Sequence, residues 1–136
     1  MQKFNDCYIT YKEDVDSLVF DWGTVNMLSE ERVTGSKSIS FGAVMLEKGQ
    51  GHTRHNHPDA DEIIYVVSGE GKQMLDDHEP VTVKPGACMW IPKGVHHSTI
   101  NTGDGPLHLV VAYIPAGAEQ ALRDIPGVRI IPPANR

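Results

Sequence analysis

The chain has 136 residues, a length that fits one domain with a single core rather than two. Lys and Arg number 12 against 18 Asp and Glu, and the resulting formal charge of -6 argues against a surface for nucleic acid or anionic membranes. With 40% hydrophobic and 22% charged residues, the composition is that of a folded globular domain and excludes a disordered chain.

Taken in chain order, the sequence begins with residues 1–17, which are polar and mixed and predict an N-terminal arm. Over residues 18–115, short runs rich in Val, Ile, Tyr and Thr alternate with Gly and Pro about once every ten residues. This spacing predicts an all-β domain of the sandwich or barrel type rather than βαβ units. Residues 116–136 predict a C-terminal extension with one short helix over 118–124, and its Pro132-Pro133 pair cannot continue a helix or a central strand.

The two cysteines are too few for a disulfide framework and form no CxxC pair. Cys88 lies in an apolar run, where we expect a small buried side chain rather than a reactive thiol. In this run Cys88 and Trp90 share one face of a strand, and Met89 and Ile91 share the other. Parity alone does not tell which face lines a pocket.

The first residues of the chain lack the apolar stretch of a signal peptide. The longest nearly apolar run, 107–114, contains a histidine and is too short to span a bilayer. We therefore expect a cytoplasmic protein without a membrane partner.

The positions of the histidines provide the clearest chemical signal. His55 and His57 are separated by one residue, so on an extended strand both point to one face, with Cα atoms about 6.6 Å apart. Glu62 follows a turn-forming stretch and is expected to open the next strand, and His97 follows a Pro-Lys-Gly turn. If the sheet closes into a barrel, these four side chains can meet inside it.

Three neutral imidazoles and one carboxylate suit a divalent transition metal. Four protein ligands around an octahedral ion leave two positions for water, substrate or dioxygen, as catalytic sites require. A lone His-x-His pair on a strand is more often a surface accident. The glycine and proline spacing around the histidines therefore has to support the metal hypothesis.

That spacing resembles the two sequence motifs of the cupin superfamily. The first motif is Gly, five residues, His-x-His, three or four residues, Glu, six residues and Gly, and every fixed position matches over residues 49–69. The second motif is Gly, five residues, Pro-x-Gly, two residues, His, three residues and Asn, and every fixed position matches over residues 86–101.

This resemblance implies the cupin double-stranded β-helix, a small jelly-roll barrel, over residues 18–115. It also implies one divalent metal ion, Mn, Fe, Ni or Zn, as the cofactor. The metal ligands that it implies are His55, His57, Glu62 and His97. Because cupins commonly pair through a sheet face and an exchanged N-terminal strand, a homodimer is expected, with residues 1–17 available as the exchanged arm.

The remaining polar residues are interpreted more plainly. His96 is expected to point away from the barrel interior, and His78 to be exposed to solvent. His52 could lie at the barrel mouth as an acid or base, but a solvated loop histidine is favoured. Arg54 could grip a substrate carboxylate at the barrel mouth, but a solvated surface position is favoured. His108 stays open between the pocket and a subunit interface. A further residue, Asn101, is expected to satisfy backbone groups at a strand end.

The open metal positions favour an enzyme. In this hypothesis the metal acts as a Lewis acid on a small sugar, hydroxy acid or dicarbonyl in an isomerase or lyase, or activates dioxygen in a dioxygenase. Glu62 is the candidate acid or base. The alternative is a metal-dependent small-molecule binding module without turnover. A metal-free barrel is a third hypothesis, which the complete ligand set disfavours. The catalytic residues, the substrate and the metal stay open.

Overall fold

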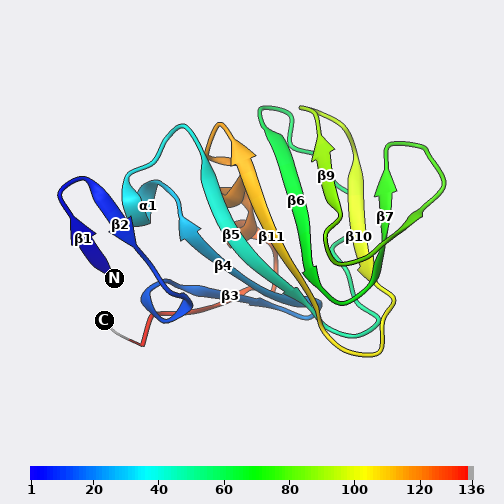
Figure 1. Cartoon of the computed structure of the whole chain (residues 1–136), viewed down its shortest axis with the longest axis horizontal. Coiled ribbons are helices and arrows are strands. Elements are labelled where there is room, and N and C mark those ends of the chain that lie inside the picture. The colour runs from blue at the N-terminus through cyan, green and yellow to red at the C-terminus, as the bar shows by residue number, and fades with distance from the viewer. Residues whose placement is uncertain (135–136) are drawn as a thin grey trace.

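The computed structural model describes residues 1–134, and β-strands dominate its architecture (Figure 1). The strands are β1 (Gln2–Phe4), β2 (Cys7–Ile9), β3 (Ser17–Phe20), β4 (Gly23–Ser29), β5 (Ser40–Leu46), β6 (Asp61–Ser68), β7 (Gly71–Leu75), β8 (Val81–Val83), β9 (Cys88–Ile91), β10 (His97–Asn101), β11 (Leu107–Ile114) and β12 (Arg129–Ile131). The helices are short: η1 (Lys12–Asp14), α1 (Glu31–Thr34) and η2 (Ala118–Asp124). The predicted all-β class is confirmed.

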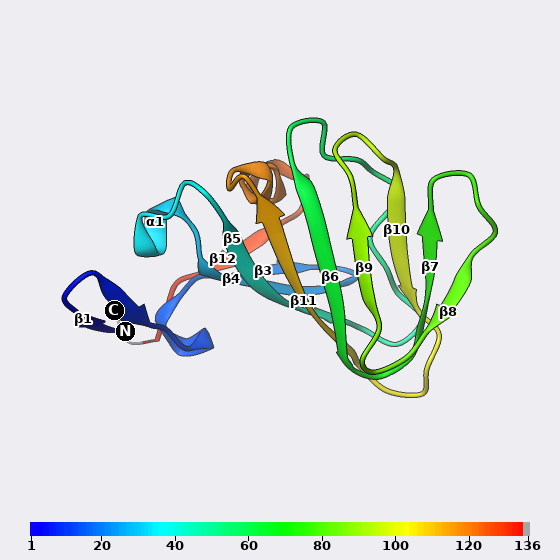
Figure 2. The same ribbon diagram turned by 45° about the horizontal axis from the view of Figure 1, so that its top comes forward.

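The strands form a long curved sheet and a second, smaller layer. The long sheet has the order β12-β3-β4-β5-β11-β6-β9, and the smaller one the order β10-β7-β8, with antiparallel pairing throughout. Figure 2 shows β10, β7 and β8 standing together at the end of the molecule opposite β1 and α1. Together the two layers make the expected jelly-roll barrel.

Period-two alternation along β6 and β11 fills the barrel interior. Leu109, Val111 and Tyr113 are buried on β11, and the neighbouring strand contributes Ile64, opposite Val111, and Glu62, opposite Tyr113. The residues between them on β6 point outward and are exposed. Because side chains alternate across a strand, this register places an apolar wall and one carboxylate on the same inner face.

Pairing between β9 and β6 decides the face that parity left open. Ile91 lies opposite Glu62, so Ile91 and Met89 point inward and are buried. Trp90 is 64% exposed on the outer face. Cys88 shares that outer face and is exposed, so the expectation of a buried cysteine was wrong. The composition of the run did not reveal that one side of this strand faces away from the core.

Both ends of the chain add small elements to the barrel. The N-terminal arm contains the separate two-stranded sheet β1-β2 (Figure 1), and the long sheet starts at β3. The helix predicted over 118–124 is present as the 3-10 helix η2, and β12 pairs with β3 at the sheet edge before the two prolines. Residues 135–136 of the predicted extension lie outside the described part of the chain. Within residues 1–134, no helix has the length and apolarity needed to cross a membrane.

Candidate metal centre

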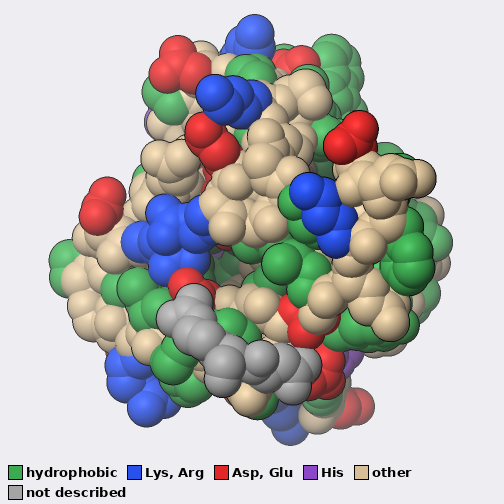
Figure 3. All heavy atoms as spheres, turned by 90° about the vertical axis from the view of Figure 1, so that its left-hand side faces the viewer, with side chains coloured by type: hydrophobic (Ala, Val, Ile, Leu, Met, Phe, Trp, Pro, Cys, Tyr) green, Lys and Arg blue, Asp and Glu red, His purple; other side chains and the backbone are tan. Residues whose placement is uncertain are grey.

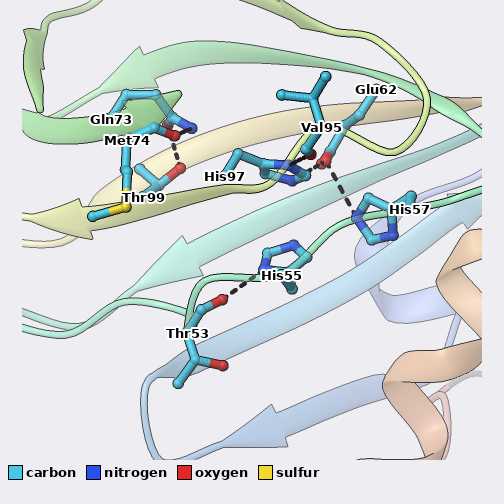
Figure 4. Close-up of polar contacts among 9 residues, drawn as sticks. All are labelled: Thr53, His55, His57, Glu62, Gln73, Met74, Val95, His97 and Thr99. Carbon is cyan, nitrogen blue, oxygen red and sulfur yellow. Dashed lines mark hydrogen bonds and ion pairs between the residues drawn. The ribbon is translucent and has the colours of Figure 1, made fainter. Parts of the chain in front are cut away.

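The four predicted ligand residues meet at the barrel interior from three separate segments (Figure 4). Glu62 lies near the start of β6, His97 opens β10, and His55 and His57 lie on the connection between β5 and β6. One ligand atom from each of the four side chains lies within 4.8 Å of the others. The structure therefore brings together the complete set that the motifs imply.

Backbone hydrogen bonds hold the two motifs against each other. The His55 amide donates to the His97 carbonyl at 3.0 Å, and the His97 amide donates to the His55 carbonyl at 2.8 Å. The Gly94 amide also donates to the His57 carbonyl at 3.0 Å. Residues 51–57 make only isolated bridges with β10 rather than a regular strand, yet these bonds suffice to set both histidines toward the interior.

Two of the histidines have one ring nitrogen already engaged. Nδ1 of His55 lies 2.6 Å from the Thr53 carbonyl oxygen, and Nδ1 of His97 lies 3.0 Å from the Val95 carbonyl oxygen. A carbonyl only accepts, so Nδ1 carries the proton in both rings and Nε2 keeps its lone pair. Metal-binding histidines are commonly oriented in this way.

Where the four side chains converge, several buried polar atoms lack hydrogen-bond partners. Among the described residues these include Nε2 of His57, Nε2 of His97 and Oε1 of Glu62. The carboxylate oxygen lies 2.7 Å from His97 Nε2 and 3.4 Å from His57 Nε2, but without hydrogen-bond geometry. Buried polar atoms are rarely left without a partner. Unpaired nitrogen and oxygen atoms converging on one point fit a divalent transition metal.

The electrostatics favour an ionised Glu62 and a neutral His55, whereas at His97 they favour the protonated ring. Burial raises the pKa of the Glu62 carboxyl, but the imidazoles of His57 and His97 outweigh burial and lower this pKa to about 2. Burial lowers the pKa of His55 to about 4, although the hydrogen bond to Thr53 opposes the change. Burial also lowers the pKa of His97, but the Glu62 carboxylate outweighs it and the net shift is upward. Glu62 is therefore ionised and His55 neutral at neutral pH.

A cavity of about 60 Å³ adjoins the ligands inside the barrel. Its lining includes Trp22, Thr99 and Tyr113, none of which the sequence analysis singled out as a site residue. Tyr113 is buried beside His57, with ring centroids 5.0 Å apart, and burial together with Glu62 raises the pKa of its phenol well above 10. Tyr113 could have been found from the sequence, because it shares the period-two alternation of Leu109 and Val111 and therefore their inward face.

His52 is part of the site, so its interpretation as a solvated loop histidine was wrong. Its ring stacks between Trp22, at a centroid distance of 4.8 Å, and His55, at 4.1 Å. Phe20 continues this column of rings, 4.4 Å beyond Trp22. Burial lowers the pKa of His52, which keeps the ring neutral. The contact depends on the turn between β3 and β4, which no local sequence signal connects with His52.

The other polar residues lie where the sequence analysis favoured. Arg54 is exposed and donates to the Asp76 carbonyl at 2.6 Å, away from the cavity lining. His96 and His78 are exposed. His108 is half-buried on the face of β11 opposite the inward-pointing residues. Asn101, which is buried, donates to the carbonyls of Leu46 at 3.0 Å and Gly105 at 2.8 Å, as expected of a structural residue.

Comparison with known proteins agrees with this geometry. Residues 42–113, which include both motifs and all four ligand residues, match the family model for the cupin domain. The chain belongs to the cupin family. This cupin is 34% identical over 88 residues to protein SchB of Streptomyces halstedii, a match that covers 65% of this chain and 63% of SchB.

Two enzymes are among the other relatives. Dimethylsulfoniopropionate lyase DddQ of Ruegeria pomeroyi is 29% identical, over 64% of this chain and 42% of the lyase. Glucose-6-phosphate isomerase of Thermococcus kodakarensis is 34% identical, over 76% of this chain and 58% of the isomerase. This cupin therefore matches less than two thirds of the length of these relatives.

Solved structures share the fold at lower sequence identity. KdgF from Halomonas sp. superposes with a TM-score of 0.72 at 18% identity, over 83% of this chain and 99% of KdgF. Oxalate decarboxylase of Lactobacillus farciminis, in complex with formate, superposes with a TM-score of 0.69 at 24% identity, over 76% of this chain and 32% of the decarboxylase. These likenesses establish the barrel and leave the reaction to the residues of the site.

Proposed function

We propose that this cupin is an enzyme that uses one divalent metal ion to act on a small oxygenated substrate such as a sugar, hydroxy acid or dicarbonyl. The observation that carries the proposal is the convergence of ligand atoms from His55, His57, Glu62 and His97 beside a cavity, where those of His57, Glu62 and His97 are buried without hydrogen-bond partners. When bound, a divalent metal supplies Lewis-acid polarisation of a substrate oxygen, and Fe(II) adds reactivity toward dioxygen.

The chain's own residues contribute charge, orientation and the exclusion of water. The Glu62 carboxylate is ionised and buried, so it can balance positive charge or accept a proton at a carboxylate oxygen. Across the strand pair, Tyr113 keeps a neutral hydroxyl that is able to donate a hydrogen bond. The apolar side chains around them make the surroundings less polar than water, which strengthens each polar interaction.

The relatives support an enzyme, and one neighbour points to a metal. A lyase and an isomerase are among the matched sequences, although the chain covers only part of each. Oxalate decarboxylase of Bacillus subtilis, which has the same fold at a TM-score of 0.66 and 22% identity, contains Mn(II) centres. Manganese therefore belongs with iron, nickel and zinc among the metals to test.

Metal analysis is the first experiment. The protein is purified without added metal and without a histidine tag, and elemental analysis is expected to find about one divalent ion per chain. The loaded protein is then screened with hydroxy acids, diketones, aldoses, ketoses and uronates, while oxygen consumption is followed. Ligands that bind but stay chemically unchanged with every metal would favour the alternative, a binding module without turnover.

The variant Glu62→Gln separates the enzyme from the binding module. It keeps the size and one ligating oxygen of the side chain but removes its charge and its ability to accept a proton. An enzyme is expected to lose most turnover while it retains its fold, whereas a binding module changes only in affinity. Glu30→Gln is the matched control, because Glu30 is equally buried but lies outside the cavity lining.

The homodimer and the cytoplasmic location stay predictions. Sedimentation at several protein concentrations measures the first directly. A dissociation constant obtained in this way also tells whether the metal centre is studied in a monomer or in an assembly.

A further inference from the structure

Aliphatic side chains form a large part of the walls of the cavity beside the metal ligands. Five of the lining residues are Val44, Leu46, Ile64, Leu109 and Val111. Their side chains come from β5, β6 and β11, the three central strands on this side of the barrel. A ligand that reaches the metal centre therefore contacts hydrocarbon over much of its remaining surface, and an apolar group is stabilised there by leaving water.

The charges around the cavity limit the charge of the ligand. Glu62 supplies the single negative charge of the four-residue set, so a divalent ion there leaves one net positive charge. Beyond the metal-ligand set, the ionisable side chains of the lining are His52 and Tyr113. Arg54, which the sequence analysis considered for a substrate carboxylate, lies outside the lining and donates to the Asp76 carbonyl instead. A second negative charge on the ligand would lack a counter-ion in this cavity, which weakens binding.

The size of the cavity limits the ligand further. About 60 Å³ gives room for a few water-sized groups. The rings of Trp22 and His52 line this space, and Phe20 and His52 both stack on the Trp22 ring. The indole therefore acts as a wall of this space.

We propose that the ligand of this site is a small oxygen chelator with one negative charge and an apolar remainder, of which the enolate of a β-diketone is an example. Such a ligand neutralises the metal centre and places its hydrocarbon against the aliphatic walls. Phosphorylated sugars and dicarboxylates, which carry a second charge, are expected to bind more weakly. This inference rests on the metal site of the proposed function and is independent of turnover.

The test is ligand binding to the zinc-loaded protein, followed by calorimetry after elemental analysis has verified the metal. The probes are acetylacetone, oxalate and inorganic phosphate. Acetylacetone is expected to bind at least about tenfold more tightly than either of the doubly charged ligands. Equal or tighter binding of oxalate or phosphate would overturn the inference while leaving the proposed enzyme intact. Tight binding of acetylacetone without its conversion by any metal would support this inference but count against the proposed enzyme. A protein that binds no metal would overturn both the inference and the proposed function.

A pair of tryptophan variants tests the location. Trp22→Ala removes the wall, so the preference for acetylacetone over its larger phenyl analogue benzoylacetone is expected to fall by about tenfold or more. Trp90→Ala removes an exposed indole on the outer face of β9 and is expected to keep the wild-type preference. An unchanged preference in folded Trp22→Ala would place the ligand outside this cavity and overturn the inference. If Trp22→Ala does not fold, the binding of acetylacetone, oxalate and phosphate to the wild-type protein tests the inference.

Discussion

Two glutamates of this protein are equally buried and behave in opposite ways. Glu30 and Glu62 are each 4% exposed. Burial raises the pKa of Glu30, and the positive charges of Arg123 and Arg32 do not reverse the shift. Burial acts on Glu62 in the same direction, but there the imidazoles of His57 and His97 outweigh it and the pKa falls to about 2. Burial alone therefore does not identify a functional carboxylate.

The two surroundings differ in whether the polar atoms have partners. Around Glu30 a cavity of about 380 Å³ is lined by charged groups that pair with one another: Arg32 with Glu30 at 3.3 Å, and Arg123 with Asp16 at 3.0 Å. Figure 3 shows this side of the molecule, where acidic and basic side chains are interspersed. Around Glu62 the ligand atoms converge without hydrogen-bond partners. Paired charges support the fold, whereas unpaired buried atoms indicate a ligand.

The largest expected effect is the loss of metal when a ligand is removed. His55→Ala, His57→Ala and His97→Ala should each weaken metal affinity by more than about 100-fold, because even residues that only orient the ligands account for about 10- to 100-fold. A competing chelator measures the affinity, and elemental analysis measures the occupancy. His96→Ala is the control, since this neighbouring histidine is exposed. Unchanged metal content in all three ligand variants would show that these histidines do not hold a metal, and that Glu62 does not differ from Glu30 in this respect.

The next effect is on pH dependence. The Glu62 carboxylate raises the pKa of His97 despite burial, so a proton occupies His97 in the metal-free protein at higher pH than in a free histidine. Since only the neutral ring binds a metal, apparent affinity should fall by about tenfold per pH unit below that pKa. His55, with a pKa of about 4, competes only in stronger acid.

The variant Glu62→Gln tests whether the Glu62 carboxylate causes the upward shift of the His97 pKa. Without the carboxylate, burial dominates and lowers the pKa of His97, so the decline in affinity should begin at lower pH than in the wild type. Competition titrations between about pH 5 and 8 measure both curves. An onset that does not move in the variant would show that Glu62 does not control His97.

In the region around Glu30, Arg123→Met should reduce the free energy of unfolding without changing metal affinity. The pair between Arg123 and Asp16 is mostly buried, with side chains 16% and 18% exposed, so its loss should cost about 2 kcal/mol in the free energy of unfolding. Urea denaturation of the metal-free protein measures this change. Lys37→Met, which removes an exposed contact with Glu31, should be neutral. Reduced metal affinity in Arg123→Met would mean that the two regions are coupled.

The smallest effect is expected from Glu30→Gln. Because the pKa of Glu30 is raised in the folded state, this state holds more protons than the unfolded chain just above pH 4.5, and wild-type stability falls as pH rises through this window. The amide cannot ionise, so the stability of the variant relative to the wild type should improve by up to about 1 kcal/mol from pH 4 to 7. Denaturation at both pH values measures the difference. A change in the opposite direction would mean that the arginines, rather than burial, dominate.

The sequence predicted the parts of the site that depend on local spacing. The ligand set could be inferred because each of the two motifs, residues 49–69 and 86–101, specifies its turns and strand starts over a short stretch of chain. The helix over 118–124 was also predicted correctly. It lies between Gly117 and Pro126, which delimit it in the sequence.

The errors concern residues whose surroundings come from distant segments. Cys88 has apolar neighbours in sequence, but its exposure follows from the pairing of β9 with β6, which puts Ile91 and not Cys88 beside the interior. His52 has polar neighbours in sequence, but the β3–β4 turn brings Trp22 against its ring. The composition of the neighbouring sequence predicts neither the exposure of Cys88 nor the contact of His52 with Trp22.

By itself, the sequence determined the family, the all-β barrel and the four residues that could hold a metal, because these depend on spacing and residue type. The tertiary structure alone decided what surrounds them: the aliphatic cavity, the ring column, the outward Arg54 and the missing hydrogen-bond partners. The physical reason is that burial and pairing arise between segments far apart in the chain. The charge and size of a ligand are therefore set by the closed barrel rather than by either motif.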